Sequence, residues 1–104
     1  MKIPKSVRIG GVEYKVEFIE NLNNGIEMCH GHIDFVRCVI QLNASEEYNN
    51  QKLCQVLWHE IMHGIQQHIG VDLGEDEEEI VDMFARGTYE VLQDNAKRFF
   101  DIKY

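Results

Sequence analysis

Two histidines four residues apart, with a glutamate beside the first, are the residues of this chain best suited to chemistry. They are His59, Glu60 and His63, in the order His-Glu-x-x-His. On a helix, positions four apart lie one turn above each other on the same face, so both imidazoles can bind one ion. Zinc takes neutral histidine nitrogens, keeps one position for water and lowers the pKa of that water to about 7. Glu60 is then placed to take the proton as the water attacks a carbonyl.

The flanking residues predict the helix that this spacing requires. Apolar residues recur at helical spacing, at Leu53, Leu57, Ile61 and Ile65. They form one arc of a helical wheel, and His59 and His63 fall almost opposite to it. One face of the helix therefore enters the core, while the other presents the histidines to a cleft or to solvent. The alternative is a pair of surface histidines on an ordinary amphipathic helix.

A catalytic zinc ion generally has three protein ligands, so a third ligand must come from elsewhere in the chain. His68 is one residue short of the position at which an extended zinc motif carries its third histidine. We expect His68 to be an ordinary helix-end histidine, favoured there by the helix dipole. The acidic run at 77–82, after a loop with two glycines, is the better source of a carboxylate ligand.

Periodicity sorts the acids of this run. A second amphipathic helix is predicted from the face formed by Ile80, Phe84, Thr88 and Val91, together with Val81 and Leu92. Glu78 and Asp82 lie along the flank of that face, at the border of core and cleft, whereas Glu79 points away from it. We therefore expect Glu78 to be the ligand and Asp82 to accept a hydrogen bond from a ligand histidine. The alternative is an acidic first helical turn that the helix dipole alone favours.

These two segments resemble a known pattern. His59-Glu60-Ile61-Met62-His63 followed by Glu78-Glu79-Ile80-Val81-Asp82 is similar to the gluzincin signature of zinc metallopeptidases, HExxH and then Glu-x-x-x-Asp. The chain resembles the minigluzincins, the reduced form of that clan, which are related to phage and mobile-element metallopeptidase-like domains. The helical part of the resemblance covers 45–95, and the strands resemble the family only in order and length.

The resemblance implies a set of roles. His59, His63 and Glu78 would bind Zn²⁺. Glu60 would be general base and acid, and Asp82 would orient a ligand histidine. The implied activity is zinc-dependent hydrolysis of peptide bonds by an endopeptidase. Its peptide or protein substrate would bind in extended form along a free edge of the sheet.

The chain departs from the family pattern in places. Glu77 precedes the implied ligand where thermolysin-like enzymes often have Asn. The downstream His or Tyr that stabilises the oxyanion in larger gluzincins has no clear counterpart. Tyr48, Tyr89 and Tyr104 are open candidates for that role. The gap bears on catalytic strength more than on metal binding.

The rest of the chain predicts a single α+β domain of 104 residues with a small antiparallel sheet. Apolar and polar residues alternate in 6–9 and 12–19 around Gly10-Gly11, which predicts an N-terminal β-hairpin. Two further strands are predicted at 26–33 and 35–42. The order of strands before helices indicates a sheet packed against two helices.

Local signals predict the helix bounds. The motif helix is expected over about 46–69, with Ser45 as its N-cap. The second helix is expected over about 76–95. The tail at 96–104 either continues this helix or packs as a separate element. Because the tail is apolar and aromatic, it could instead cover the cleft and hold an enzyme latent.

Charge and apolar runs bound the partners. The net charge is −8 and no basic stripe is visible, which argues against a nucleic-acid partner. The apolar runs are too short to span a bilayer, so no membrane partner is expected. The N-terminus leads into a strand pattern rather than a signal-peptide core, and we expect a cytoplasmic protein.

Three cysteines give no disulfide framework. The cluster of Cys29, His30, His32 and Cys38 matches no standard zinc spacing. We expect these cysteines and Cys54 to be small buried residues. The two histidines are expected at the surface, where one could line the cleft.

Two other classes of function remain open. The domain could hold zinc structurally, or be a degenerate peptidase that acts as an interaction or regulatory module. Retention of Glu60 argues against degeneration, because a structural site gains nothing obvious from a base there. The chain could also be a small acidic regulator in which the motif is coincidence. Agreement among the motif, the helix phase, the Glu78/Asp82 pair and the order of elements favours the zinc enzyme.

Overall fold

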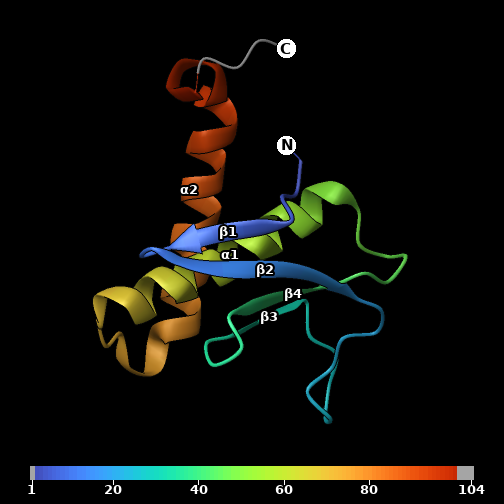
Figure 1. Cartoon of the computed structure of the whole chain (residues 1–104). Coiled ribbons are helices and arrows are strands. Elements are labelled where there is room, and N and C mark those ends of the chain that lie inside the picture. The colour runs from blue at the N-terminus through green and yellow to red at the C-terminus, as the bar shows by residue number, and fades with distance from the viewer. Residues whose placement is uncertain (1, 101–104) are drawn as a thin grey trace.

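The computed structural model of the chain describes residues 2–100, and four strands precede two long helices in it. The elements are β1 (Ser6–Ile9), β2 (Val12–Ile19), β3 (Gly31–Asp34), β4 (Val39–Asn43), α1 (Asn50–Ile69), the 3₁₀ turn η1 (Gly74–Asp76) and α2 (Glu77–Phe100). Figure 1 shows the strands as one sheet with the helices to one side. The predicted α+β class is confirmed.

The sheet is mixed rather than antiparallel, which corrects one part of the prediction. Its strand order is β1-β2-β4-β3, and the β1–β2 and β3–β4 pairs are antiparallel. The β2–β4 pair is parallel, with Val16 opposite Ile40 and Phe18 opposite Leu42. Four of the five residues of β4 are buried, so this strand is best shielded between two neighbours. β1 and β3 are therefore the edges of the sheet.

The strand predicted at 26–33 is shorter in the structure, where β3 begins only at Gly31. The Asn24 side chain accepts hydrogen bonds of 2.9 Å from the backbone N–H groups of Ile26 and Glu27. Gly25 adopts φ +91°, which no strand uses. Asparagine that bonds nearby backbone competes with strand pairing. This local turn therefore prevails over the apolar alternation.

The motif helix begins later than predicted. Asn49, not Ser45, is its N-cap, and the Asn49 side chain accepts a 2.8 Å hydrogen bond from the Lys52 N–H. The Ser45 hydroxyl instead donates to Asn43 Oδ1 at 2.6 Å, at the end of β4. Ser45 therefore belongs to the turn that follows β4 and does not begin the helix.

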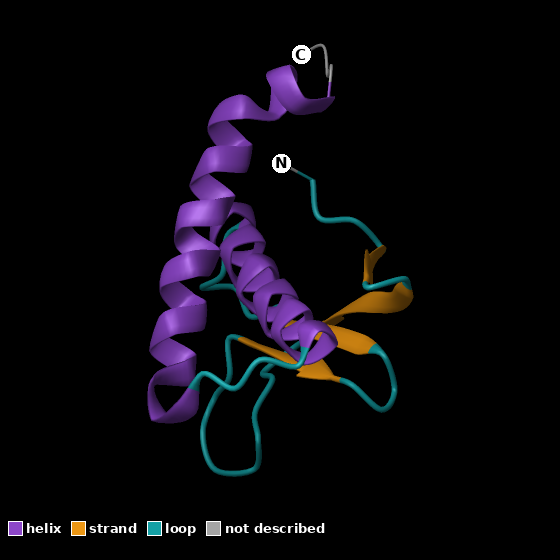
Figure 2. Ribbon diagram, turned by 90° about the vertical axis from the view of Figure 1, so that its left-hand side faces the viewer, coloured by secondary structure: helices purple, strands orange, loops and turns teal. Residues whose placement is uncertain are grey.

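The layers are the sheet, then α1, then α2 (Figure 2). α1 packs Leu57 and Ile61 against a sheet face that includes Ile40 and Leu42. Gly64 allows close approach, because a Cβ there would lie 2.6 Å from Ile9 Cδ1. α2 packs on α1, and among the described residues its backbone approaches no strand closely. α1 is therefore the central element of the described fold.

The buried face of α2 differs from the predicted one. The structure buries Val81, Ala85, Tyr89 and Ala96 against the rest of the molecule. Phe84 and Val91, predicted to face the core, are 63% and 53% exposed. Two alanines on the buried face let α2 approach α1 closely, so the larger side chains turn outward.

The predicted tail is partly helical. α2 continues to Phe100, so residues 96–100 extend it, and residues 101–104 lie outside the described residues. None of residues 96–100 lines the cleft described below. Between residues 2 and 100, no helix combines the length and the apolar character that crossing a bilayer requires.

Candidate metal centre

α1 holds the two histidines of the motif on one face. The helix ends at Gly70, whose left-handed conformation directs its N–H to the Gln66 carbonyl oxygen at 2.9 Å. The rings of His59 and His63 lie edge to face with their centroids 4.9 Å apart. Their side chains are 20% and 13% exposed, so both imidazoles are largely sheltered yet reach the cleft.

α2 brings Glu78 to both histidines. His63 Nε2 lies 2.6 Å from Glu78 Oε1, and His59 Nε2 lies 3.1 Å from Glu78 Oε2. Within the described residues, these three side chains form the one group of three or more donors able to hold a metal ion. Their ligand atoms all lie within 4.8 Å of one another. The structure thus brings together two imidazole nitrogens and one carboxylate, the donor set of a catalytic zinc site.

The two contacts of Glu78 are close to the spacing of ligands around a zinc ion, and the widest separation in the donor group is at most 4.8 Å. Zinc binds nitrogen and oxygen ligands at about 2.0–2.2 Å, which places tetrahedral ligand atoms about 3.4 Å apart. The 3.1 Å contact of His59 is already close to this separation. The 2.6 Å contact of His63 has to open by less than about 1 Å, and the Glu78 side chain is exposed enough to allow it.

Asp82 lies on the other nitrogen of His59. His59 Nδ1 is 3.3 Å from Asp82 Oδ1, and Arg86 Nη2 is 2.5 Å from Asp82 Oδ2. A carboxylate on Nδ1 fixes the proton there and leaves Nε2 free for a metal. Both nitrogens of His59 thus face carboxylates, and a metal ion at Nε2 would offset part of their negative charge.

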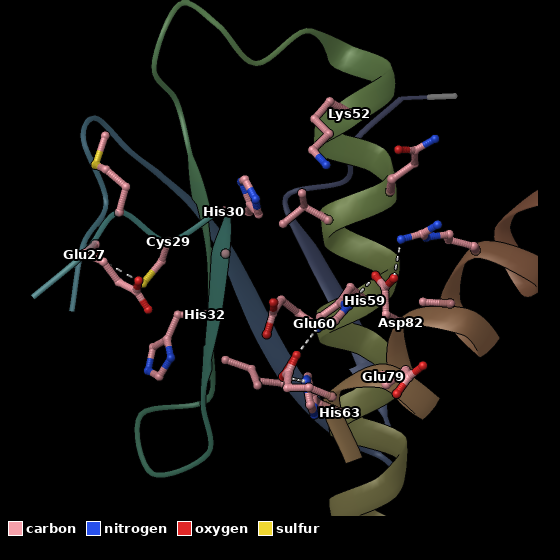
Figure 3. Close-up of a pocket in the computed structure, with 18 of the residues that line it drawn as sticks. Glu27, Cys29, His30, His32, Lys52, His59, Glu60, His63, Glu79 and Asp82 are labelled. Atoms are coloured by element: carbon pink, nitrogen blue, oxygen red, sulfur yellow. Dashed lines mark hydrogen bonds and ion pairs between the residues drawn. The ribbon is translucent and has the colours of Figure 1, made fainter. Parts of the chain in front are cut away.

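Glu60 points the other way, toward the sheet (Figure 3). The residue is only 7% exposed. A Cβ on Gly31 of β3 would lie 3.2 Å from Glu60 Oε2, so the carboxylate packs against this glycine. Burial, and next the negative charge of Glu78, raise the pKa of Glu60 to about 8. A carboxyl group tuned near neutral pH is suited to both taking and giving a proton.

These residues line a cleft of about 980 Å³ between β3, α1 and α2. In Figure 3, His59, Glu60, His63 and Asp82 gather between the edge strand and the two helices. Acidic residues outnumber the cations Lys52 and Arg86 along its walls. Carboxylates held this close repel one another, and a bound cation would relieve that repulsion.

The remaining predicted residues take different places. Glu79 lines the cleft but is not part of the donor group. His68 is in the last turn of α1, and its ring packs against Gly10 in the β1–β2 turn. The structure therefore places neither residue among the candidate ligands.

The cysteine and histidine cluster forms no second donor group among the described residues. Cys54 is buried as predicted, whereas Cys29 and Cys38 are only half-buried. His30 and His32 both line the cleft, and His30 Nδ1 lies 2.6 Å from the Tyr48 hydroxyl. These two histidines border the cleft because the edge strand β3 forms one of its walls.

The three tyrosines named as candidates for an oxyanion donor either do not line the cleft or lie outside the described residues. Tyr89 is buried on α2 and does not line the cleft. Tyr48 does not line it either, and its hydroxyl contacts His30. Tyr104 lies outside the described residues. Sequence reasoning gave no candidate that the described structure places beside the donor group.

Two contributors to the site were missed. Gly31 gives room for Glu60, and a glycine inside a strand pattern is itself a signal of close approach. Arg86 forms an ion pair with Asp82. The two residues are four apart on a predicted helix, and this spacing is typical of such pairs.

Comparisons of this chain with protein-family models, with curated proteins and with solved structures each found no match. A functional assignment must therefore come from the side chains and their geometry.

Proposed function

We propose that this protein is a zinc-dependent endopeptidase of gluzincin type. The observation that carries the proposal is the convergence of His59 Nε2, His63 Nε2 and the Glu78 carboxylate within 4.8 Å of one another. A buried carboxyl group, Glu60, borders the same cleft. Three ligands and a base on one cleft are the parts that metal-assisted hydrolysis needs.

The residues would divide the reaction between them. Zn²⁺ bound by His59, His63 and Glu78 would supply Lewis acidity and lower the pKa of a water molecule. Glu60 takes a proton from the attacking water and delivers it to the amine nitrogen that leaves. The raised pKa of Glu60, about 8 in the metal-free chain, supports this double role. Asp82 holds His59 with Nε2 directed at the ligand position.

The substrate is proposed to be a peptide in extended form. β3 is an edge of the sheet and also forms a wall of the cleft. Its unpaired backbone groups can accept a further strand, which would carry a peptide bond past Glu60. The cytoplasmic location and the lack of nucleic-acid and membrane partners stay predictions from the sequence.

One observation favours a second candidate, a catalytically weak zinc-binding module that interacts with other proteins. Neither Tyr48 nor Tyr89 lies beside the donor group, so the described residues offer no tyrosine to stabilise an oxyanion. Loss of such a donor in an enzyme costs a factor of about 10² to 10³ in rate. Metal binding would be unaffected.

Two measurements test the proposal together. Elemental analysis of untagged protein, purified without added metal, is expected to give about one zinc per chain and none in His59→Ala. A peptide-library assay is expected to show cleavage by the parent and none by Glu60→Gln, which keeps its zinc. Zinc without cleavage would favour the interaction module. No zinc, and none taken up on titration, would overturn both readings.

A further inference from the structure

The outward face of α2 is apolar and has no partner within the described structure. Phe84 and Val91 lie seven residues apart on the same side of the helix and are 63% and 53% exposed. The buried stripe of Val81, Ala85 and Tyr89 lies roughly a quarter turn away around the helix. The α2 face, as we call it, consists of Phe84, Gly87, Thr88 and Val91. Exposed apolar side chains grouped on one face of a helix can mark an interaction surface.

Gly87 lies in the middle of this face, and no contact with the described residues 2–100 requires a glycine there. A Cβ added there would meet nothing within 4 Å. Glycine destabilises a helix interior relative to alanine, and no contact within the described residues offsets this loss of helix stability. A glycine does serve a purpose where a second helix packs closely against the same face, because it lets the two backbones approach.

The polar side chains near the stripe are satisfied within their own helix. Thr88 Oγ1 donates to the Phe84 carbonyl oxygen at 2.5 Å, and Asn95 Nδ2 donates to the Val91 carbonyl oxygen at 2.9 Å. Water can therefore leave the α2 face without stranding these donors. The face can be buried at little polar cost.

The charges of α2 are arranged so that the helix complements a reversed copy of itself. Its first turn is acidic, with Glu77, Glu78 and Glu79, and η1 before it adds Glu75 and Asp76. Its last turn carries Lys97 and Arg98. Antiparallel packing of two such helices sets the basic last turn of each beside the acidic first turn of the other, whereas parallel packing sets like charges together at both ends.

We propose that the α2 face is the interface of a symmetric homodimer in which two copies of α2 pack antiparallel. A two-fold axis beside Gly87 and Thr88 places Phe84 of each copy opposite Val91 of the other. The same axis sets Arg98 of each copy against the acidic first turn of the other. Apolar register and charge register thus agree on one arrangement.

The shape of the molecule leaves this face accessible. α2 has 24 residues and is therefore about 36 Å long. Its C-terminal turns run past α1 and project from the body of the molecule (Figures 1 and 2). A second copy can lie along α2 without displacing α1 or the sheet, and the α2 face contains no residue of the donor group.

Sedimentation equilibrium over a range of protein concentrations tests the proposal. The parent is expected to form dimers, with or without a zinc chelator, so failure of the zinc assignment leaves this result standing. Val91→Asp is expected to weaken the dimer about tenfold or more in Kd. Val36→Asp is the matched control, because Val36 is 93% exposed and lies in the turn between β3 and β4, outside the α2 face. A parent that stays monomeric overturns the proposal, as does a dimer that Val91→Asp leaves intact.

Two further variants keep the test independent of folding defects. Gly87→Ala is expected to raise the thermal stability of dilute, monomeric protein and to weaken the dimer. A folding defect would lower the stability of the monomer as well, so it cannot produce these two effects together. Thr88→Cys, next to the axis, is expected to give a disulfide-linked dimer under oxidation, whereas Phe84→Cys alone does so poorly. The parent reports the background from its own cysteines. Equal cross-linking at both positions overturns the antiparallel arrangement.

Discussion

The carboxylate of Glu60 lies against Gly31 of the edge strand, where a Cβ would sit 3.2 Å from Glu60 Oε2. α1 supplies the proposed base and β3 supplies the space for it. The contact joins α1, which carries the proposed base, to β3, which is proposed to hold the substrate. The lack of a side chain at Gly31 lets these two elements lie this close.

Gly31→Ala is therefore expected to disturb the base without removing the ligands. The new methyl group would lie 2.6 Å from Val56 Cγ1, and relief requires Val56 and Glu60 to shift. Such overpacking typically costs about 1–3 kcal/mol of stability. Thermal unfolding should report that loss, zinc content should stay at the parent value, and peptide hydrolysis should fall. Gly87→Ala, measured on dilute, monomeric protein, is the control, because its methyl group meets open space within one chain and should stabilise the helix.

Removing the proposed third ligand should distinguish Glu78 from its neighbour. Glu78→Ala is expected to weaken zinc binding by more than the roughly 10- to 100-fold that loss of an outer hydrogen-bond partner costs. Glu79→Ala changes the same charge in the same cleft but touches neither histidine, so its effect should be small. Competition titration with a chelating dye measures both. Equal losses would mean that the negative charge of the cleft, and not a ligand, was removed.

Arg86 and Asp82 should act on zinc through His59. Asp82→Asn keeps the shape but weakens the hydrogen bond to His59 Nδ1, and we expect zinc affinity to fall about 10- to 100-fold. Arg86→Ala frees the Asp82 carboxylate and should cost less, because the contact with His59 can persist. Arg8→Ala removes an exposed cation distant from the site and serves as the control. An unchanged affinity in Asp82→Asn would remove this residue from the site.

The α+β class and the placement of His59 and His63 on one helix face followed from the sequence, because helix geometry is local and regular. The approach of Glu78 to these histidines also depends on how α2 packs on α1, which local geometry does not fix. The sheet was predicted to be antiparallel, and the parallel β2–β4 pair was missed because pairing depends on how segments distant in sequence meet, and alternation carries no information on neighbours. The face of α2 was mispredicted because Phe84 and Val91 are apolar but α1 selects the small Ala85 for close contact. In a single sequence, an apolar face that packs against a second copy, as proposed for α2, shows the same pattern as a face that packs in the core.

The metal-free protein should lose stability as the pH rises, because of Glu60. Its carboxyl group titrates near 4.5 when unfolded but holds its proton to about 8 when folded. Below pH 4.5 both states are protonated and there is no penalty. Between these two values the unfolded state binds fewer protons than the folded state, so stability falls, by on the order of 3 kcal/mol between pH 5 and 8.

Chemical denaturation across this pH range, with a chelator present, measures the effect. Glu60→Gln removes the titrating group, so its stability should exceed that of the parent increasingly toward pH 8. Glu79→Gln is the control, since this residue is exposed. Parallel pH profiles for the parent and Glu60→Gln would show that Glu60 is already ionised in the metal-free protein.

Zinc binding should release protons, and Glu60 is a group from which one should come. Burial raises the pKa of Glu60 to about 8, so its carboxyl group holds a proton near neutral pH when no metal is bound. The charge of a zinc ion beside it would favour its ionisation. Titration calorimetry in buffers of different ionisation enthalpy counts the protons released. Near neutral pH the parent should release about one more than Glu60→Gln. If both release the same number, Glu60 keeps its proton beside the metal and cannot be the base that takes one from water.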